Sequence, residues 1–118
     1  MSTQFNGAGS FAANSAISAF RAVALSSNRG VGLNPTTAHP IGFTQQDVAS
    51  GDYVAVKFFT GPGTQKCAVT VTPVTVGSTV FAGASGFVST TGTITVGRSL
   101  TSTSSDGGII EIEPLTVI

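Results

Sequence analysis

The chain has very little charge, and this shortage excludes several classes of protein. Only 8% of its 118 residues are Asp, Glu, Lys or Arg, against about 25% in typical soluble domains. Five basic residues balance five acidic ones, so the formal net charge is zero. Because such a surface has little self-repulsion, it associates readily. We therefore expect a protein that assembles with other proteins, and not an enzyme.

Other absences narrow the choice of partners. The basic residues are scattered along the chain and not clustered as nucleic-acid binding requires, so no nucleic-acid partner is expected. No apolar run approaches the roughly 20 residues of a membrane span, and no secretory signal is recognisable. The one cysteine, Cys67, permits no internal disulfide. We expect synthesis in the cytoplasm and no membrane partner.

Residues that could carry chemistry are equally sparse. A Ser-His-Asp triad would need the single histidine, His39, but no G-x-S-x-G motif accompanies it. A surface-loop histidine is the favoured interpretation, and a small hydrolase using His39 is kept as an alternative. The sequence also lacks C-x-x-C, H-x-x-x-H and carboxylate-rich motifs, so no metal and no cofactor are predicted.

The acidic and glycine-rich segments have structural interpretations. Asp47 and Asp52 flank a turn, where their side chains are expected to bond local backbone N–H groups. Glu111 and Glu113 lie two residues apart on one strand and would share its solvent face. The segment 83–86 lacks the lysine and the helix of a phosphate-binding loop, which favours a turn.

What the sequence does contain is a series of short segments with period-two alternation, separated by turn residues. Many such strands, with no segment of helical period, predict an all-β sandwich or small barrel. Cys67 is in phase with Val69, which favours a buried, inert thiol. If a helical turn exists, it is expected after Pro73 or around Thr44–Val48. The strands are expected near residues 16–25, 31–33, 41–44, 53–59, 66–72, 74–76, 79–81, 87–89, 93–100 and 109–113.

The first residues differ from the rest. Residues 1–15 are rich in small side chains and have no usable period, so they predict a flexible N-terminal arm followed by a single β domain over residues 16–118. Phe5 and Phe11 are aromatic exceptions within this arm. They would be good anchors if the arm docks on another protein.

The order of six segments along the chain provides a further indication. It resembles the order found in the capsid cement (decoration) proteins of tailed bacteriophages, a family long known only as a domain of unknown function. The resemblance covers roughly Ile17 to Leu115, and the order of the motifs carries it. The matching segments are PIGF at 40–43 before DVASGDYVAVK at 47–57, VGSTVF at 76–81 before ASGFV at 84–88, and VGRSL at 96–100 before DGGIIEI at 106–112.

This resemblance implies a small β-barrel or β-tulip-like fold without catalytic residues. It also implies a homotrimer on the outer capsid surface of the virion, where it bridges neighbouring copies of the major capsid protein and stabilises the mature head. Another phage structural module, such as a fibre or baseplate component, is the alternative.

The N-terminal arm matches no motif of the family, so its role is a physical hypothesis. An extended arm can add a strand to an exposed capsid edge, and three arms of one trimer would act together. The candidate capsid-binding residues are Phe5, Asn6, Phe11 and Asn14.

Overall fold

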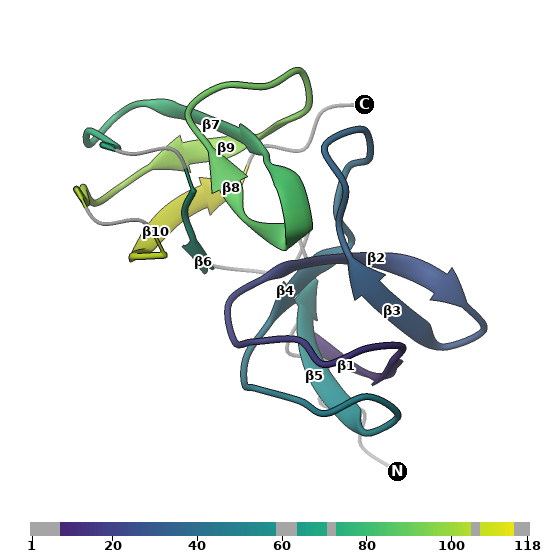
Figure 1. Cartoon of the computed structure of the whole chain (residues 1–118). Coiled ribbons are helices and arrows are strands. Elements are labelled where there is room, and N and C mark those ends of the chain that lie inside the picture. Colours follow the sequence, from purple (N-terminus) through teal and green to yellow (C-terminus); the bar gives the residue numbers. More distant parts are fainter. Residues whose placement is uncertain (1–7, 59–63, 71–72, 105–106, 115–118) are drawn as a thin grey trace, which may run out of the picture.

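The computed structural model describes residues 8–58, 64–70, 73–104 and 107–114. These residues form two β-sheet units, a closed five-stranded barrel followed by a curled five-stranded sheet (Figure 1). The only described helical element is a short 3-10 turn, η1, at Ala84–Gly86. The prediction of an all-β fold built on a small barrel is confirmed.

The barrel uses the first five strands in the order β1-β3-β2-β4-β5. It closes because β1 pairs with β3 on one side, in parallel, and with β5 on the other, antiparallel. The remaining pairs are antiparallel. The strands are β1 (Ala8–Ala13), β2 (Ala22–Ser27), β3 (Gly30–Leu33), β4 (Gly42–Thr44) and β5 (Tyr53–Phe58).

Strand β1 corrects the prediction for the N-terminus. The flexible arm was expected to extend to residue 15, but Ala8–Ala13 form a barrel strand, in register with β5 from Ala8 opposite Lys57 to Ala12 opposite Tyr53. Small residues have low strand propensity, and here pairing with two neighbouring strands overrides it. The described fold therefore begins at Ala8, while residues 1–7 lie outside the described part.

The start of β2 also differs from the expected pattern. The alternation beginning at residue 16 predicts one strand, but the chain turns first, with Phe20 at a φ of 63°. Ile17 instead forms an isolated antiparallel bridge with Val48. Ala22 and Val23 are neighbours in β2, yet both are buried, because each faces a different core.

The second sheet has the strand order β6-β10-β9-β7-β8, and we call it the half-barrel. Its paired strands are antiparallel. A parallel bridge between Val69 and Val88 brings the two edges of the sheet together, so the sheet curls around its own core. The strands are β6 (Gln65–Ala68), β7 (Thr79–Ala82), β8 (Val88–Ser89), β9 (Thr95–Ser99) and β10 (Ile109–Pro114).

The 3-10 turn η1 lies between β7 and β8, at neither of the two places where a helical turn was expected. It forms because Ser85 and Gly86 both have positive φ angles, 55° and 79°. Glycine adopts this region at no steric cost, so the segment Gly83–Gly86 is a turn, as predicted.

Two cores fill the molecule, and β2 and β4 separate them. Inward-facing side chains of the barrel, such as Phe11 and Val56, form the first core. The half-barrel forms the second core around Ile110 and Ile112, and Phe43 of β4 belongs to this second core although β4 is a barrel strand. The barrel thus supplies one wall of the half-barrel core.

Candidate interaction surfaces

Of the four predicted arm residues, the structure describes Phe11 and Asn14, and they lie in different environments. The Phe11 side chain is 5% exposed, and its ring packs edge-on against Phe58 with 5.9 Å between the ring centroids. The Arg29 guanidinium lies 4.7 Å from the Phe11 ring centroid and donates a 2.8 Å hydrogen bond to the Ser10 carbonyl. Phe11 therefore stabilises the barrel and cannot serve as an exposed anchor, because its side chain is buried in the barrel core.

Of the other three residues, only Asn14 belongs to the part of the chain that the structure describes. Asn14 is exposed just after β1, and its backbone N–H donates to the Val31 carbonyl at 2.9 Å. Phe5 and Asn6 lie outside the described residues. A capsid-binding role for Phe5, Asn6 and Asn14 stays a prediction.

His39 lies in the loop between β3 and β4 and is exposed, as the sequence indicated. Its Nδ1 atom is 3.1 Å from the Pro40 carbonyl oxygen. The small hollow beside it is lined by His39, Thr93, Ile94 and Thr95, so no carboxylate is among the described residues that line it.

Three of the acidic side chains, those of Asp47, Glu111 and Glu113, make contacts within the fold. Asp47 accepts a 2.8 Å hydrogen bond from the Ala19 N–H, so the predicted bond to backbone exists but joins segments 28 residues apart and is not local. Glu113 forms an ion pair with Arg98 at 2.8 Å on the outer face of the sheet. Glu111 is half-buried and accepts a hydrogen bond from the Thr64 hydroxyl. The two glutamates therefore have separate partners and form no acid pair.

Cys67 is fully buried in the half-barrel core. Burial raises the pKa of its thiol far above its usual value of 9.0, because the thiolate would be poorly solvated there. Since the thiolate is the reactive form, the thiol is inert in the folded chain, as predicted.

The described part of the chain shows neither a metal-binding cluster nor a membrane-spanning helix. It contains no group of three or more His, Cys, Asp and Glu residues able to hold a metal ion. It also contains no helix with the length and hydropathy of a membrane span.

One end of the half-barrel carries exposed aliphatic side chains, which we call the aliphatic tip: Val76, Leu100 and Ile109. Their exposed fractions are 60%, 40% and 44%. Backbone hydrogen bonds hold their segments together, because Gly77 N–H donates to the Ser99 carbonyl and Leu100 N–H to the Glu111 carbonyl. Figure 1 shows the three segments at the same end of the half-barrel.

The turns and strand ends that carry the aliphatic tip are uncharged, and the nearest described charged side chains lie further along the strands: Arg98 on β9, and Glu111 on β10 opposite Lys66. The described residues at 73–78, 100–104 and 107–109 include no Asp, Glu, Lys or Arg. Exposed aliphatic side chains bordered by a few charged groups are typical of a protein–protein interface, which has an apolar centre and a polar rim. The sequence pattern alone did not reveal this surface, because the three residues come from separate segments of the chain: a turn, the residue after β9 and the start of β10.

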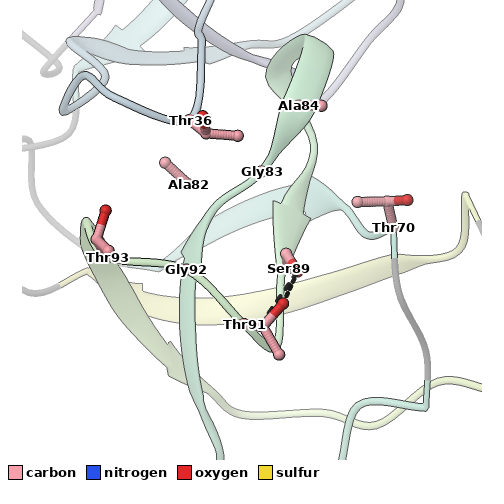
Figure 2. Close-up of a pocket in the computed structure, with 9 residues that line it drawn as sticks. All are labelled: Thr36, Thr70, Ala82, Gly83, Ala84, Ser89, Thr91, Gly92 and Thr93. Carbon is pink, nitrogen blue, oxygen red and sulfur yellow. Dashed lines mark hydrogen bonds between the residues drawn. The ribbon is translucent and has the colours of Figure 1, made fainter.

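A second surface feature is a hollow of about 440 Å³ between the barrel and the half-barrel. Thr36, from the β3–β4 loop, forms one wall, and the segments around β8 and before β9 form the others (Figure 2). Ser89 is 3% exposed, and its Oγ accepts a 3.1 Å hydrogen bond from Thr91 N–H. The lining residues are Thr36, Thr70, Ala82, Gly83, Ala84, Ser89, Thr91, Gly92 and Thr93.

Comparison with known proteins is informative about the fold. No protein-family model and no curated protein matches the sequence. Among solved structures, the N base of the head fiber gp8.5 of bacteriophage phi29 superposes with a TM-score of 0.74 at 17% sequence identity. The alignment covers 93% of this chain and 98% of that one, so the two proteins share the same overall fold.

Proposed function

We propose that this chain is a structural protein of a tailed-bacteriophage virion, which binds the outer surface of the capsid as a homotrimer. In that position it would contact neighbouring copies of the major capsid protein and stabilise the mature head. The observation that carries the proposal is the fold shared over 93% of the chain with the base of a phage head fibre. Since a fold alone does not determine function, the surface must support the role as well.

The surface supports an assembly role. With only 8% charged residues, the chain can pack against a partner while few ions lose their hydration. The aliphatic tip, with Val76, Leu100 and Ile109 each at least 40% exposed, supplies apolar area to such a contact. We assign the aliphatic tip to the contact with the major capsid protein.

The N-terminal residues are the second proposed contact. Strand β1 begins at Ala8, so the segment 1–7 can be removed without shortening a described strand. Phe5 and Asn6 lie in that segment and would add main-chain and aromatic contacts on the capsid. Three such segments in a trimer would strengthen attachment by multivalency.

A density map of the assembled particle tests the location. We expect trimeric density of this fold on the outside of the capsid, touching more than one major capsid protein. Density confined to the tail or the baseplate would contradict the proposal. The mass of the free protein in solution tests the trimer independently, and a monomeric mass would refute that part alone.

Decoration of capsids in vitro tests the aliphatic tip. Replacing Val76, Leu100 and Ile109 together with Ser should weaken capsid binding by at least tenfold while the trimer mass is unchanged, because about 100 Å² of apolar contact contributes about 2.5 kcal/mol. Leu25→Ser is the matched control, since Leu25 is 59% exposed but lies on the barrel. Equal binding by the triple variant and the wild type would show that the tip does not face the capsid.

The similarity to the N base of the phi29 head fiber favours one second candidate function: this chain would be the base of a head fibre on the capsid. The two candidates differ in what projects from the particle surface. A cement protein ends in a compact trimer, whereas a fibre base continues into density that extends outwards. The same particle map therefore distinguishes them.

A further inference from the structure

We propose that the hollow between the β3–β4 loop and the half-barrel binds a neutral saccharide. This inference goes beyond the proposed attachment to the capsid, because the hollow shares no lining residue with the aliphatic tip. It rests on the size of the hollow, on the chemistry of its lining and on the way in which two parts of the fold form it.

The size suits a small ligand. The volume of about 440 Å³ lies within the range of roughly 300–1,000 Å³ that is typical of small-molecule sites. Figure 2 shows Thr36 and Thr70 on opposite sides, Ser89 and Thr91 below and between them, and Thr93 at the left. A ligand seated there would contact both the barrel loop and the half-barrel.

The lining determines the class of ligand. None of its residues is charged, so nothing in the lining would balance the charge of an ionic ligand. Five of the lining residues carry hydroxyl groups, which a purely apolar ligand would deprive of water without offering hydrogen bonds in return. A neutral polyhydroxylated ligand avoids both costs, because each Thr or Ser hydroxyl can donate and accept.

The hydroxyl groups have different roles within the hollow. Ser89 is buried, and its Oγ is already engaged by the Thr91 N–H at 3.1 Å and lies 3.4 Å from Thr91 Oγ1. This contact fixes the turn that carries Thr91. The side chains of Thr36, Thr91 and Thr93 are exposed, so they can reach a ligand. Methyl groups of these threonines and of Ala84 would contact the C–H faces of a sugar ring.

The test is a titration of the full-length ¹⁵N-labelled chain with glucose, galactose, N-acetylglucosamine and lactose, followed by amide chemical shifts. Concentrations up to about 50 mM cover the weak affinities expected of an open site. At least one sugar should shift the amides of residues 89–93, Gly83 and Thr36. The source of the ligand is distinguished by chain length, because a surface glycan should bind more tightly as an oligosaccharide, and a free sugar equally well as a monomer.

Variants test whether the sugar binds in the hollow. Thr91→Val and Thr93→Val keep the side-chain shape but lose a hydroxyl, and each should weaken binding about fivefold. Ala84→Phe should abolish binding by filling the hollow from an exposed position. Thr79→Val is the control, because Thr79 is exposed on β7 and does not line the hollow. The amide spectrum of each variant shows whether it is folded.

Three outcomes would overturn the proposal. The first is the absence of shifts with every neutral sugar. The second is a set of shifts that Ala84→Phe leaves unchanged. The third is a stronger response of the same amides to inorganic phosphate or sulfate than to any sugar, since that would show an anion site.

Discussion

The barrel and the half-barrel have five strands each, but they exclude water from their cores in different ways. In the barrel every strand pairs with two others, and its core contains only residues of the barrel and its loops. The half-barrel closes through the bridge between Val69 and Val88, and it completes its core with Ala22 and Phe43 of the barrel. The half-barrel core is therefore incomplete without the barrel, whereas the barrel core contains no residue of the half-barrel.

The two units are also joined by the segment around η1. Gly86 N–H donates to the Asn34 carbonyl at 3.0 Å, which ties η1 to the loop after β3. The Arg21 guanidinium lies 3.8 Å from the centroid of the Phe87 ring, and its Nη1 donates to the Ser85 carbonyl at 3.3 Å. These contacts fix the orientation of the half-barrel on the barrel.

The largest expected effect is that of removing β1. Deletion of residues 1–13 takes away a neighbour of both β3 and β5 together with the buried Phe11, so the barrel should not fold. Because the half-barrel uses the barrel as a wall, its structure should be lost as well. Circular dichroism and amide spectra measure both losses.

The matched control is deletion of residues 1–7, which leaves every described strand intact. A folded spectrum for this shorter deletion and an unfolded one for the longer deletion are expected. Retention of a dispersed spectrum by the longer deletion would show that β1 is dispensable, and would restore the arm predicted over residues 1–15.

The next effect comes from single core truncations. Phe43→Ala and Phe11→Ala should each lower the free energy of unfolding by about 3–5 kcal/mol, because each leaves a cavity of aromatic size. Hydrogen exchange should separate them, with faster exchange of the Ile110 and Ile112 amides in Phe43→Ala, and of the Val54 and Val56 amides in Phe11→Ala.

Tyr53→Ala is the control for these truncations, since Tyr53 is 66% exposed and its loss should cost less than about 1 kcal/mol. If Phe43→Ala accelerated exchange only in the barrel, the assignment of Phe43 to the half-barrel core would be wrong.

These two core residues also show what the sequence can and cannot predict. The alternation of Val54 and Val56, or of Ile110 and Ile112, predicts a strand and its inward face, and the structure confirms both. Strand β1 has no such pattern, and its pairing with β3 is parallel, so its partners depend on the whole barrel. Phe43 lies on a predicted strand, but no local pattern indicates which of two cores it faces.

The same distinction applies to the surfaces. The inert environment of Cys67 could be predicted, because its phase with Val69 places it inside. The hollow could not be predicted, since Thr36 is more than 50 residues from Ser89 and only the packing of the two units brings them together. A threonine-rich stretch at residues 89–93 is the one local signal for it.

A smaller effect tests the contact through η1. Gly86 has a φ of 79°, and a Cβ atom there would lie 2.7 Å from the Ala22 carbonyl oxygen and 2.8 Å from Leu33 Cδ2. Gly86→Ala should therefore lower stability by about 2–3 kcal/mol, combining backbone strain with a clash against the barrel. Denaturant unfolding monitored by circular dichroism provides the measurement.

Gly77→Ala separates the two contributions. Gly77 has a φ of 89°, but a Cβ atom there meets nothing within 4 Å. Its substitution should cost only the backbone term of about 1 kcal/mol. Equal losses for the two variants would mean that η1 does not pack closely on the barrel.

The smallest effect concerns the pH dependence of the half-barrel, through Cys67. Its folded-state pKa is raised above the usual value of 9.0 by burial, so at high pH only the unfolded chain forms the thiolate. The contribution of the neutral thiol to the free energy of unfolding is therefore fully present below pH 9, and it decreases as the pH rises above 9. Between pH 8 and pH 10 the expected loss is about 1.4 kcal/mol relative to Cys67→Ala, which has no thiol.

Thiol labelling of Cys67 in the wild-type chain tests whether the half-barrel opens more readily than the barrel. Cys67 lies in the half-barrel core, whereas Val54 and Val56 lie in the barrel core. Because the half-barrel depends on the barrel, but the barrel core is complete without it, labelling of Cys67 should be faster than exchange of the Val54 and Val56 amides predicts. Equal opening rates at both places would mean that the two units open only together, and the dependence would then be mutual.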